Sequence, residues 1–138
     1  MTESVQQLVR DAMVPEPFSL AAASSAREAA EALGRDAVRA VLVCDDGKLT
    51  GVITRKTLVR EIVAAGRDPQ TTSVGAIAEP PNFTIPSDLP LDAGFAFLEE
   101  HDLERVPVVD DGRLVGVLSR AVVQRRLYED DPPPDLDG

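Results

Sequence analysis

The sequence predicts a mixed α/β (α+β) protein made of two copies of one β-α-β-β-α unit. Three observations lead to this fold class. The stretch DDGKLTGVITR at 45–55 returns as DDGRLVGVLSR at 110–120, an offset of 65 residues. The same offset, without a gap, aligns the chain from residue 9 to residue 128. Within each copy, β-rich runs alternate with helix-like segments. We therefore interpret the chain as an internal duplication.

The identical positions in the two copies fall mainly in the last two predicted strands and the turn and corner beside them. Val41, Val43, Gly47, Gly51, Arg55 and Arg60 align with Val106, Val108, Gly112, Gly116, Arg120 and Arg125.

The first half of each copy is predicted to hold a short helix, a brief strand and a longer helix. The short helices are expected at 5–13 and 73–78, and the brief strands at 18–20 and 83–85. The longer helix of copy one should begin at Ser25, with Glu28 completing a capping box. Its counterpart spans 90–102, where Pro90 suits a first helical turn.

The second half of each copy is predicted to be a β-hairpin followed by a helix. The strands are expected at 39–44 and 48–54, and again at 105–109 and 113–119. An Asp-Asp-Gly stretch between each pair indicates a tight turn, so we interpret both aspartate pairs as turn residues and not as metal ligands. The closing helices are expected at 55–66, with Gly66 as C-cap, and at 120–129.

Residues 8–66 and 67–128 are thus predicted to be two domains, each of which would be only marginally stable alone. We expect their sheets to face each other about a pseudo-twofold axis, with 64–72 as the connection. Residues 129–138 form an acidic, Pro-rich tail that composition predicts to be disordered.

Composition and charge narrow the function classes. The formal net charge is −10, and the body without its tail is still negative, which argues against nucleic-acid binding. No apolar run is long enough for a membrane span and no signal peptide is evident, so we expect a cytoplasmic protein. The single cysteine, Cys44, lies in an apolar run and is interpreted as a core residue.

The tandem order of strand, helix, hairpin and helix resembles the cystathionine-beta-synthase (CBS) domain pair, or Bateman module, of the stand-alone bacterial type. RVPVVDDGRLVGVLSR and VLVCDDGKLTGVITR carry the resemblance most clearly. It covers about residues 8 to 128, and copy one departs from the family at Leu42, where copy two has Pro107. The resemblance implies a regulatory module, commonly a homodimer, that binds adenosyl compounds such as AMP, ADP, ATP or S-adenosylmethionine between its domains.

The resemblance also implies the site residues. The family motif Gly-hydrophobic-hydrophobic-Thr/Ser-x-x-Asp matches Gly51 to Thr54 and Gly116 to Ser119, but Thr57 and Val122 replace the acidic residue that binds ribose. Losing that hydrogen bond weakens a ligand by roughly 10- to 100-fold, so copy one, with Thr57, is the better candidate. Base and sugar contacts are implied at Ser19, Leu20, Ala40, Thr84, Ile85 and Arg105, and phosphate contacts at Arg39, Arg55, Arg105 and Arg120.

Simpler structural roles account for the same residues. Thr54 and Ser119 are expected to cap the helices that they precede, and the repeated arginines suit surface pairing and solubility. No nucleophile with its base, metal cluster or Gly-rich phosphate loop is present in the sequence, so we expect no enzyme.

Two hypotheses about function remain. The first is a regulatory module that binds a small adenosyl-type or phosphorylated ligand and signals to an unknown protein partner. The alternative is a ligand-free, dimerising interaction module with degenerate nucleotide sites.

Overall fold

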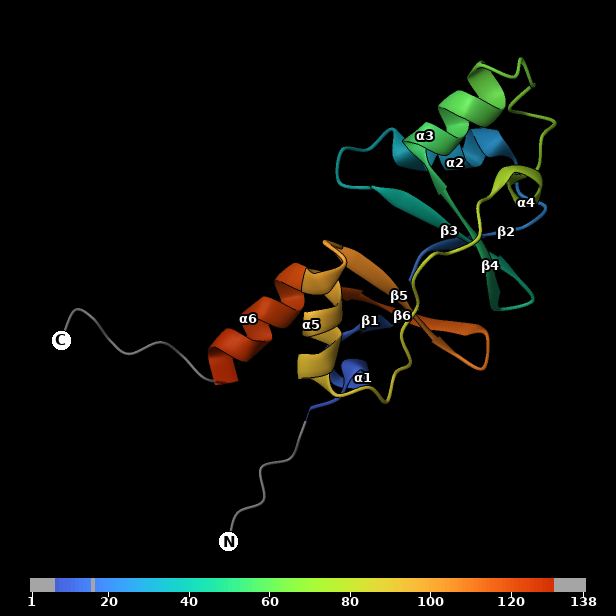
Figure 1. Cartoon of the computed structure of the whole chain (residues 1–138). Helices are drawn as coiled ribbons and strands as arrows, with labels where there is room; N and C mark the ends of the chain where they lie inside the picture. The colour runs from blue at the N-terminus through green and yellow to red at the C-terminus, as the bar shows by residue number, and fades with distance from the viewer. Residues whose placement is uncertain (1–6, 16, 131–138) are drawn as a thin grey trace, which may run out of the picture. The chain divides into compact units, whose positions relative to one another are not determined.

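The computed structural model describes residues 7–15 and 17–130, which form two compact units of mixed helix and strand (Figure 1). Unit 2 consists of residues 18–82 with the hairpin tip 111–114. Unit 1 consists of residues 7–15, 17, 83–110 and 115–130. The predicted α/β fold class with two repeats is confirmed, whereas the facing sheets and the pseudo-twofold axis stay predictions.

Unit 2 contains a three-stranded sheet and the helices that flank it in sequence. The strands run in the order β2, β3, β4, with β2 parallel to β3 and β3 antiparallel to β4. In chain order the elements are β2 (Ser19–Ala21), α2 (Ala26–Leu33), β3 (Ala40–Asp45), β4 (Lys48–Thr54), α3 (Arg55–Leu58), the π-helix η1 (Val59–Val63) and α4 (Val74–Ile77).

Unit 1 repeats this arrangement with small differences. In chain order it contains α1 (Val9–Ala12), β1 (Val14–Pro15), α5 (Leu91–Glu100), β5 (Arg105–Asp110), β6 (Arg113–Ser119, whose first two residues are counted with unit 2) and α6 (Arg120–Asp130). β6 pairs with β5, and β1 pairs antiparallel with β6 through Val14 and Val117. The strand expected at 83–85 is reduced to a single parallel bridge between Ile85 and Val108.

Each unit has its own hydrophobic core, and the two cores use equivalent positions of the repeat. The core of unit 2 contains Leu20, Ala26, Ala29, Leu33, Val41, Val43, Ile53, Ile62, Val74 and Ile77. The core of unit 1 contains Val9, Ala12, Ile85, Leu91, Leu98, Val106, Val108, Leu118 and Val123. Alternate residues of β3 (Val41 and Val43) and of β5 (Val106 and Val108) belong to these cores. Leu42, between the two valines of β3, is also buried but lies outside the core cluster of unit 2.

The first helix of each repeat packs in the unit formed mainly by the other repeat. Val9 of α1, from repeat one, is fully buried in the core of unit 1, and Val74 of α4, from repeat two, is fully buried in the core of unit 2. The two compact units therefore exchange the first helices of the two sequence repeats. The domain limits of 8–66 and 67–128 stay a prediction.

Both hairpin turns have the geometry that the sequence predicts. Asp46 and Gly47 have φ angles of 53° and 81°, and Asp111 and Gly112 have 51° and 82°. Two successive positive φ angles characterise the type I′ turn, which Asp-Gly adopts readily because glycine has no Cβ and aspartate tolerates the left-handed region. The interpretation of these aspartates as turn residues agrees with this geometry.

Caps and connections follow the sequence with two differences. The Ser25 hydroxyl accepts a hydrogen bond from the Glu28 N–H at 3.2 Å, but among the described contacts Glu28 does not return the bond. The closing helix of repeat one, expected over 55–66, consists of α3 continued by the π-helix η1, and Gly66 follows with a φ of 70°. The connection 64–72 is part of unit 2, because the N–H groups of Ala26 and Arg27 donate to the carbonyls of Thr72 and Pro69. The predicted tail lies outside the described residues except for its first two, which end α6.

Candidate functional site

In unit 2, several predicted site residues meet at one edge of the sheet. Ala40, the first residue of β3, pairs with Thr54, the last residue of β4. Ser19, the first residue of β2, pairs with Leu42, two residues further along β3. Ser19, Ala40 and Thr54 therefore lie near the same end of three neighbouring strands. Leu20 points the other way and is buried in the core, with 9% of its surface exposed.

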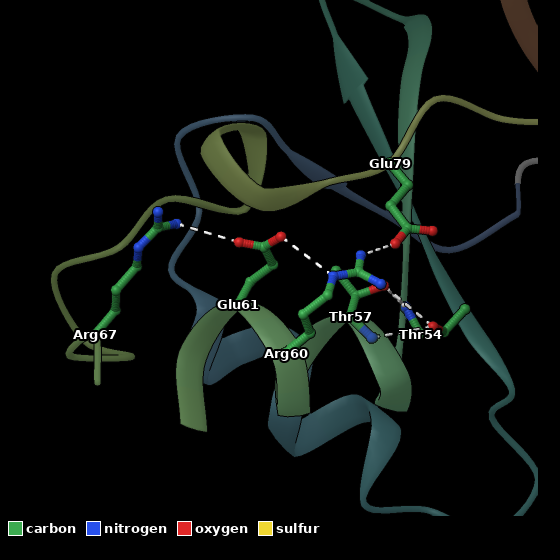
Figure 2. Close-up of polar contacts among 6 residues, drawn as sticks. All are labelled: Thr54, Thr57, Arg60, Glu61, Arg67 and Glu79. Carbon is green, nitrogen blue, oxygen red and sulfur yellow. Dashed lines mark hydrogen bonds and ion pairs between the residues drawn. The ribbon is translucent and has the colours of Figure 1, made fainter. Parts of the chain in front are cut away.

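The corner from β4 to α3 is closed by two threonines that cap each other (Figure 2). Thr54 Oγ1 accepts from the Thr57 N–H at 3.3 Å, and Thr57 Oγ1 accepts from the Thr54 N–H at 3.1 Å. The two hydroxyl oxygens are 3.1 Å apart and share a further hydrogen bond. The predicted cap at Thr54 is confirmed. Thr57, which stands at the position of the acidic residue in the motif, is completely buried, and its hydroxyl is engaged in these bonds within the protein.

The two arginines predicted near this corner are both exposed. Arg55 donates from Nη2 to the carbonyl of Arg35 at 2.9 Å. Arg39 makes no side-chain hydrogen bond or ion pair with the part of the chain that the structure describes. Of these two guanidinium groups, Arg39 therefore has the larger number of donors available for an anion.

A network of ion pairs, not foreseen from the sequence, lies beside the corner (Figure 2). Arg60, on η1, donates from Nη2 to Glu79 and from Nε to Glu61, the latter at 3.3 Å. Glu61 also pairs with Arg67 at 3.7 Å. The hydrogen bond to Glu79, and then that to Glu61, raises the pKa of Arg60 above its ordinary value, so the guanidinium stays charged. The offset of 65 residues aligns Glu79 with Val14, so it marks Glu79 as a difference between the repeats, but it does not indicate the contact with Arg60.

Glu79 is held beside β4 by its backbone. The Val52 N–H donates to the Glu79 carbonyl at 2.8 Å, and the Glu79 N–H donates to the Val52 carbonyl at 3.0 Å. Gly51 permits this approach, because a Cβ there would come within 2.5 Å of the Ala78 Cβ. The glycine of the motif thus has a packing role: it lets the chain that carries Glu79 lie against the strand.

In unit 1, the equivalent corner from β6 to α6 has fewer side-chain hydrogen bonds. Ser119 ends β6, and its hydroxyl makes no hydrogen bond within the described residues, so the cap predicted there is not seen. Val122 is partly buried. Thr84 is exposed, whereas Ile85 is buried and its N–H donates to the Pro107 carbonyl at 3.1 Å.

Of the two arginines predicted in unit 1, Arg120 is already paired with carboxylates. Its guanidinium lies 3.7 Å from Glu99 and 3.7 Å from Asp102. Its N–H also donates to the Glu104 carbonyl at 2.8 Å, which ties the start of α6 to the end of the preceding loop. Arg105 begins β5 and is exposed.

A second contact that sequence reasoning missed fixes Asp110 in unit 1. The Ser87 hydroxyl donates to Asp110 Oδ2 at 2.6 Å, and the Ser87 N–H donates to Oδ1 at 3.0 Å. These bonds, with a smaller effect from the charge of Arg10, lower the pKa of Asp110. The aligned residue for Ser87 in repeat one is Ala22, which has no hydroxyl, so this contact belongs to one repeat alone.

The structure also bears on metals and membranes. Among the described residues, no three His, Cys, Asp or Glu side chains come together in a way that would hold a metal ion. Within the same residues, no helix has the length and apolar composition that crossing a bilayer requires.

Comparison with known proteins identifies the repeated unit. The model of the CBS domain matches twice, at residues 9–64 and 74–129, which together cover most of the chain. The chain belongs to the CBS domain family. The two matches correspond to the two sequence repeats, and each ends on the helix that follows a Gly-x-x-Thr/Ser corner.

Individual CBS proteins resemble the chain over most of its length. Hypoxic response protein 1 of Mycobacterium tuberculosis is 32% identical over 102 residues, which are 73% of this chain and 71% of the relative. A crystal structure of hypoxic response protein I with two coordinated zinc ions has a TM-score of 0.71 at 28% identity, covering 86% of this chain and 98% of the other. The structure of CBSX2 in complex with AMP has a TM-score of 0.71 at 26% identity, covering 89% and 97%.

Proposed function

We propose that this CBS-domain pair is a regulatory module that binds a small adenosyl-type or phosphorylated ligand at its strand-to-helix corners and passes the signal to a protein partner. The observation that carries the proposal is the corner itself. Ser19, Ala40 and Thr54 lie at one edge of a three-stranded sheet, with Arg39 and Arg55 exposed next to them in sequence. The AMP complex of the relative CBSX2 supports the choice of ligand class.

The chemistry of the corner fits a sugar–phosphate group. A hydroxyl and a strand-edge backbone supply hydrogen bonds for ribose, and a guanidinium binds phosphate through paired N–H donors. The Thr57 hydroxyl is already hydrogen-bonded to Thr54, and no carboxylate stands at this position. We therefore expect the ribose to be bound without a carboxylate. Affinity should therefore be modest, in the micromolar to millimolar range.

A thermal-shift panel tests the proposal. AMP, ADP, ATP, S-adenosylmethionine and NADH are each added up to millimolar concentration, and at least one should raise the melting temperature, because a ligand that binds only the native state stabilises it. Absence of any shift across the panel would remove the proposed ligand class.

Two hydroxyl variants locate the binding corner. Ser119→Ala removes a hydroxyl with no hydrogen bond in the described structure, whereas Thr54→Ala also removes a helix cap. If the ligand uses the first repeat, Thr54→Ala should lower affinity beyond its effect on stability, and Ser119→Ala should leave affinity unchanged. The reverse pattern assigns the ligand to the second repeat.

A second candidate function is the ligand-free interaction module, and two observations favour it. Thr57 is buried with its hydroxyl engaged, and Val59 and Val63 on η1 are 58% and 72% exposed. Exposed valines on a helix surface are suited to contact with another protein surface. A homodimer is expected under both functions, and scattering in solution would test it. A stable dimer together with an empty ligand panel would select this second function.

CBS-domain pairs are usually regulatory rather than catalytic, and we place this protein with them. The cytoplasmic location expected from the sequence belongs to the same proposal.

A further inference from the structure

The two CBS units differ in charge at two pairs of equivalent positions beside their corners. In unit 2, Arg60 is in contact with two carboxylates, Glu79 and Glu61. Arg60 and Glu79 are each about half exposed, with side-chain exposures of 49% and 46%. An anion in solution can therefore reach Arg60 only in competition with an acidic side chain that the protein itself provides.

Among the side chains that the structure describes, the equivalent place in unit 1 has no such carboxylate. The offset of 65 residues aligns Arg60 with Arg125, Glu61 with Arg126 and Glu79 with Val14. The backbone geometry is the same in the two units, since Val14 pairs with Val117 just as Glu79 pairs with Val52. Val14 is 51% exposed and Arg125 is also exposed. Unit 1 thus presents two arginines where unit 2 presents one arginine and two glutamates.

Within the described side chains, the contact that Arg126 makes does not cancel the positive charge of this pair of arginines. Arg126 donates from Nη1 to the Oε1 atom of Gln7 at 3.3 Å, and that partner is a neutral amide. Guanidinium groups bind phosphate oxygens through two parallel N–H donors, and a nearby carboxylate opposes such binding both by occupying the donors and by repulsion.

We propose that Glu79 is an internal counter-ion that keeps anionic ligands away from Arg60, so that a phosphate-bearing ligand is directed to Arg125 and Arg126 of the second repeat. The inference rests on the proposed function for its class of ligand. It goes beyond that function in naming the residue position, Glu79 or Val14, that decides which repeat accepts the anion.

Site-resolved binding of inorganic pyrophosphate tests the inference. The side-chain Nε–H signals of arginine are followed by NMR at low ionic strength, where exposed charges are least screened. In the unaltered protein, pyrophosphate should shift the signals of Arg125 and Arg126 at concentrations that leave Arg60 unmoved. Glu79→Gln should make Arg60 respond, with affinity there higher by roughly five- to tenfold.

Three further variants make the comparison specific. Glu31→Gln removes an exposed glutamate of the same unit that pairs with Arg27, so it matches the change in charge without touching Arg60. Arg60→Gln combined with Glu79→Gln should abolish the gain. Val14→Glu should weaken the response of Arg125 by a similar factor, because it gives unit 1 the carboxylate of unit 2.

The inference is overturned if Arg60 in Glu79→Gln responds no better than in Glu31→Gln, or if Arg60 and Arg125 respond alike in the unaltered protein. A parallel titration with AMP separates this result from the proposed function. If pyrophosphate binds selectively to the second repeat and AMP does not bind, the inference about Glu79 is supported and the proposed adenosyl ligand is contradicted. If AMP binds and Glu79→Gln does not change its binding, the proposed ligand is supported and the inference about Glu79 is contradicted.

Discussion

Ser87 holds Asp110 through two hydrogen bonds, 2.6 Å from its hydroxyl and 3.0 Å from its N–H. The loop before α5 is thereby fastened to the end of β5, 23 residues later in the chain. In repeat one the aligned residues are Ala22 and Asp45, and Asp45 is exposed. The two repeats thus share a backbone fold but differ in the side-chain hydrogen bonds that hold its loops.

Asp110→Asn should destabilise the protein in a pH-dependent way. The folded-state pKa of Asp110 lies below its ordinary value of 3.8, so ionised Asp110 contributes stability above that pH and loses it as the pH falls through the folded-state pKa. We expect the variant to be less stable by about 1 kcal/mol at neutral pH, after allowance for solvent screening. The difference should shrink below about pH 4.

Urea unfolding between pH 7 and pH 3 measures this effect. Asp45→Asn is the matched control, because the same substitution at the aligned position removes no hydrogen bond from serine. A destabilisation by Asp110→Asn that is equal at both ends of the pH range would contradict an ionic contribution.

Thr57→Val should lower the stability of unit 2. The substitution keeps the shape of a fully buried side chain but removes the hydroxyl that accepts the Thr54 N–H. Losing a cap and leaving a polar group short of a partner costs about 1–2 kcal/mol, to be measured by denaturant unfolding. Val122→Thr, at the aligned position, is the control and should change stability little. Equal effects of the two variants would argue against the reciprocal cap.

Gly51→Ala should destabilise by about 1–3 kcal/mol, because the new Cβ meets the Ala78 Cβ at 2.5 Å and forces the neighbouring chain to move. Gly34→Ala provides the control, since its Cβ comes no closer than 3.4 Å to its neighbours and its φ of −69° suits alanine. Thermal unfolding should separate the two variants clearly. A harmless Gly51→Ala would show that the chain carrying Glu79 is not closely packed on β4.

The turn aspartates should tolerate asparagine and be indifferent to metal. Asp46→Asn and Asp111→Asn place a residue that accepts positive φ angles in each type I′ turn, so stability should stay within about 0.5 kcal/mol. Asp46→Val should cost about 1–2 kcal/mol, because a β-branched residue is strained at a φ of 53°. Melting temperatures with EDTA and with added calcium should agree; a calcium-dependent rise would revive the metal interpretation.

The sequence predicted most of the backbone because its strongest signals are local. The bounds of β4 and β6 agree with the expected ranges of 48–54 and 113–119, and both turns have the geometry that Asp-Gly favours. Because the chain is duplicated, each local pattern occurs twice, and the second copy supports the interpretation of the first. Thr54 as a cap followed from the same kind of reasoning, since a hydroxyl residue preceding a helix satisfies its first N–H groups.

What could not be predicted depends on contacts between distant segments. No local pattern links Ser87 to Asp110 or Arg60 to Glu79, which are 23 and 19 residues apart. The π-helix at 59–63 arises in a sequence whose spacing equally suits a regular helix. The exchange of the first helices is likewise invisible, because a repeat aligns identically whether its helix packs on its own copy or on the other.

The crossed placement of α1 and α4 constrains how such a protein can have arisen and how it can be divided. A chain carrying one repeat alone would lack a helix in its own core, and its first helix would expose a valine, Val9 or Val74, that is now fully buried. Two single-repeat chains could complete each other's cores by exchanging their first helices. In the present chain the two repeats are covalently joined, so separately expressed halves should recover their fold only on mixing.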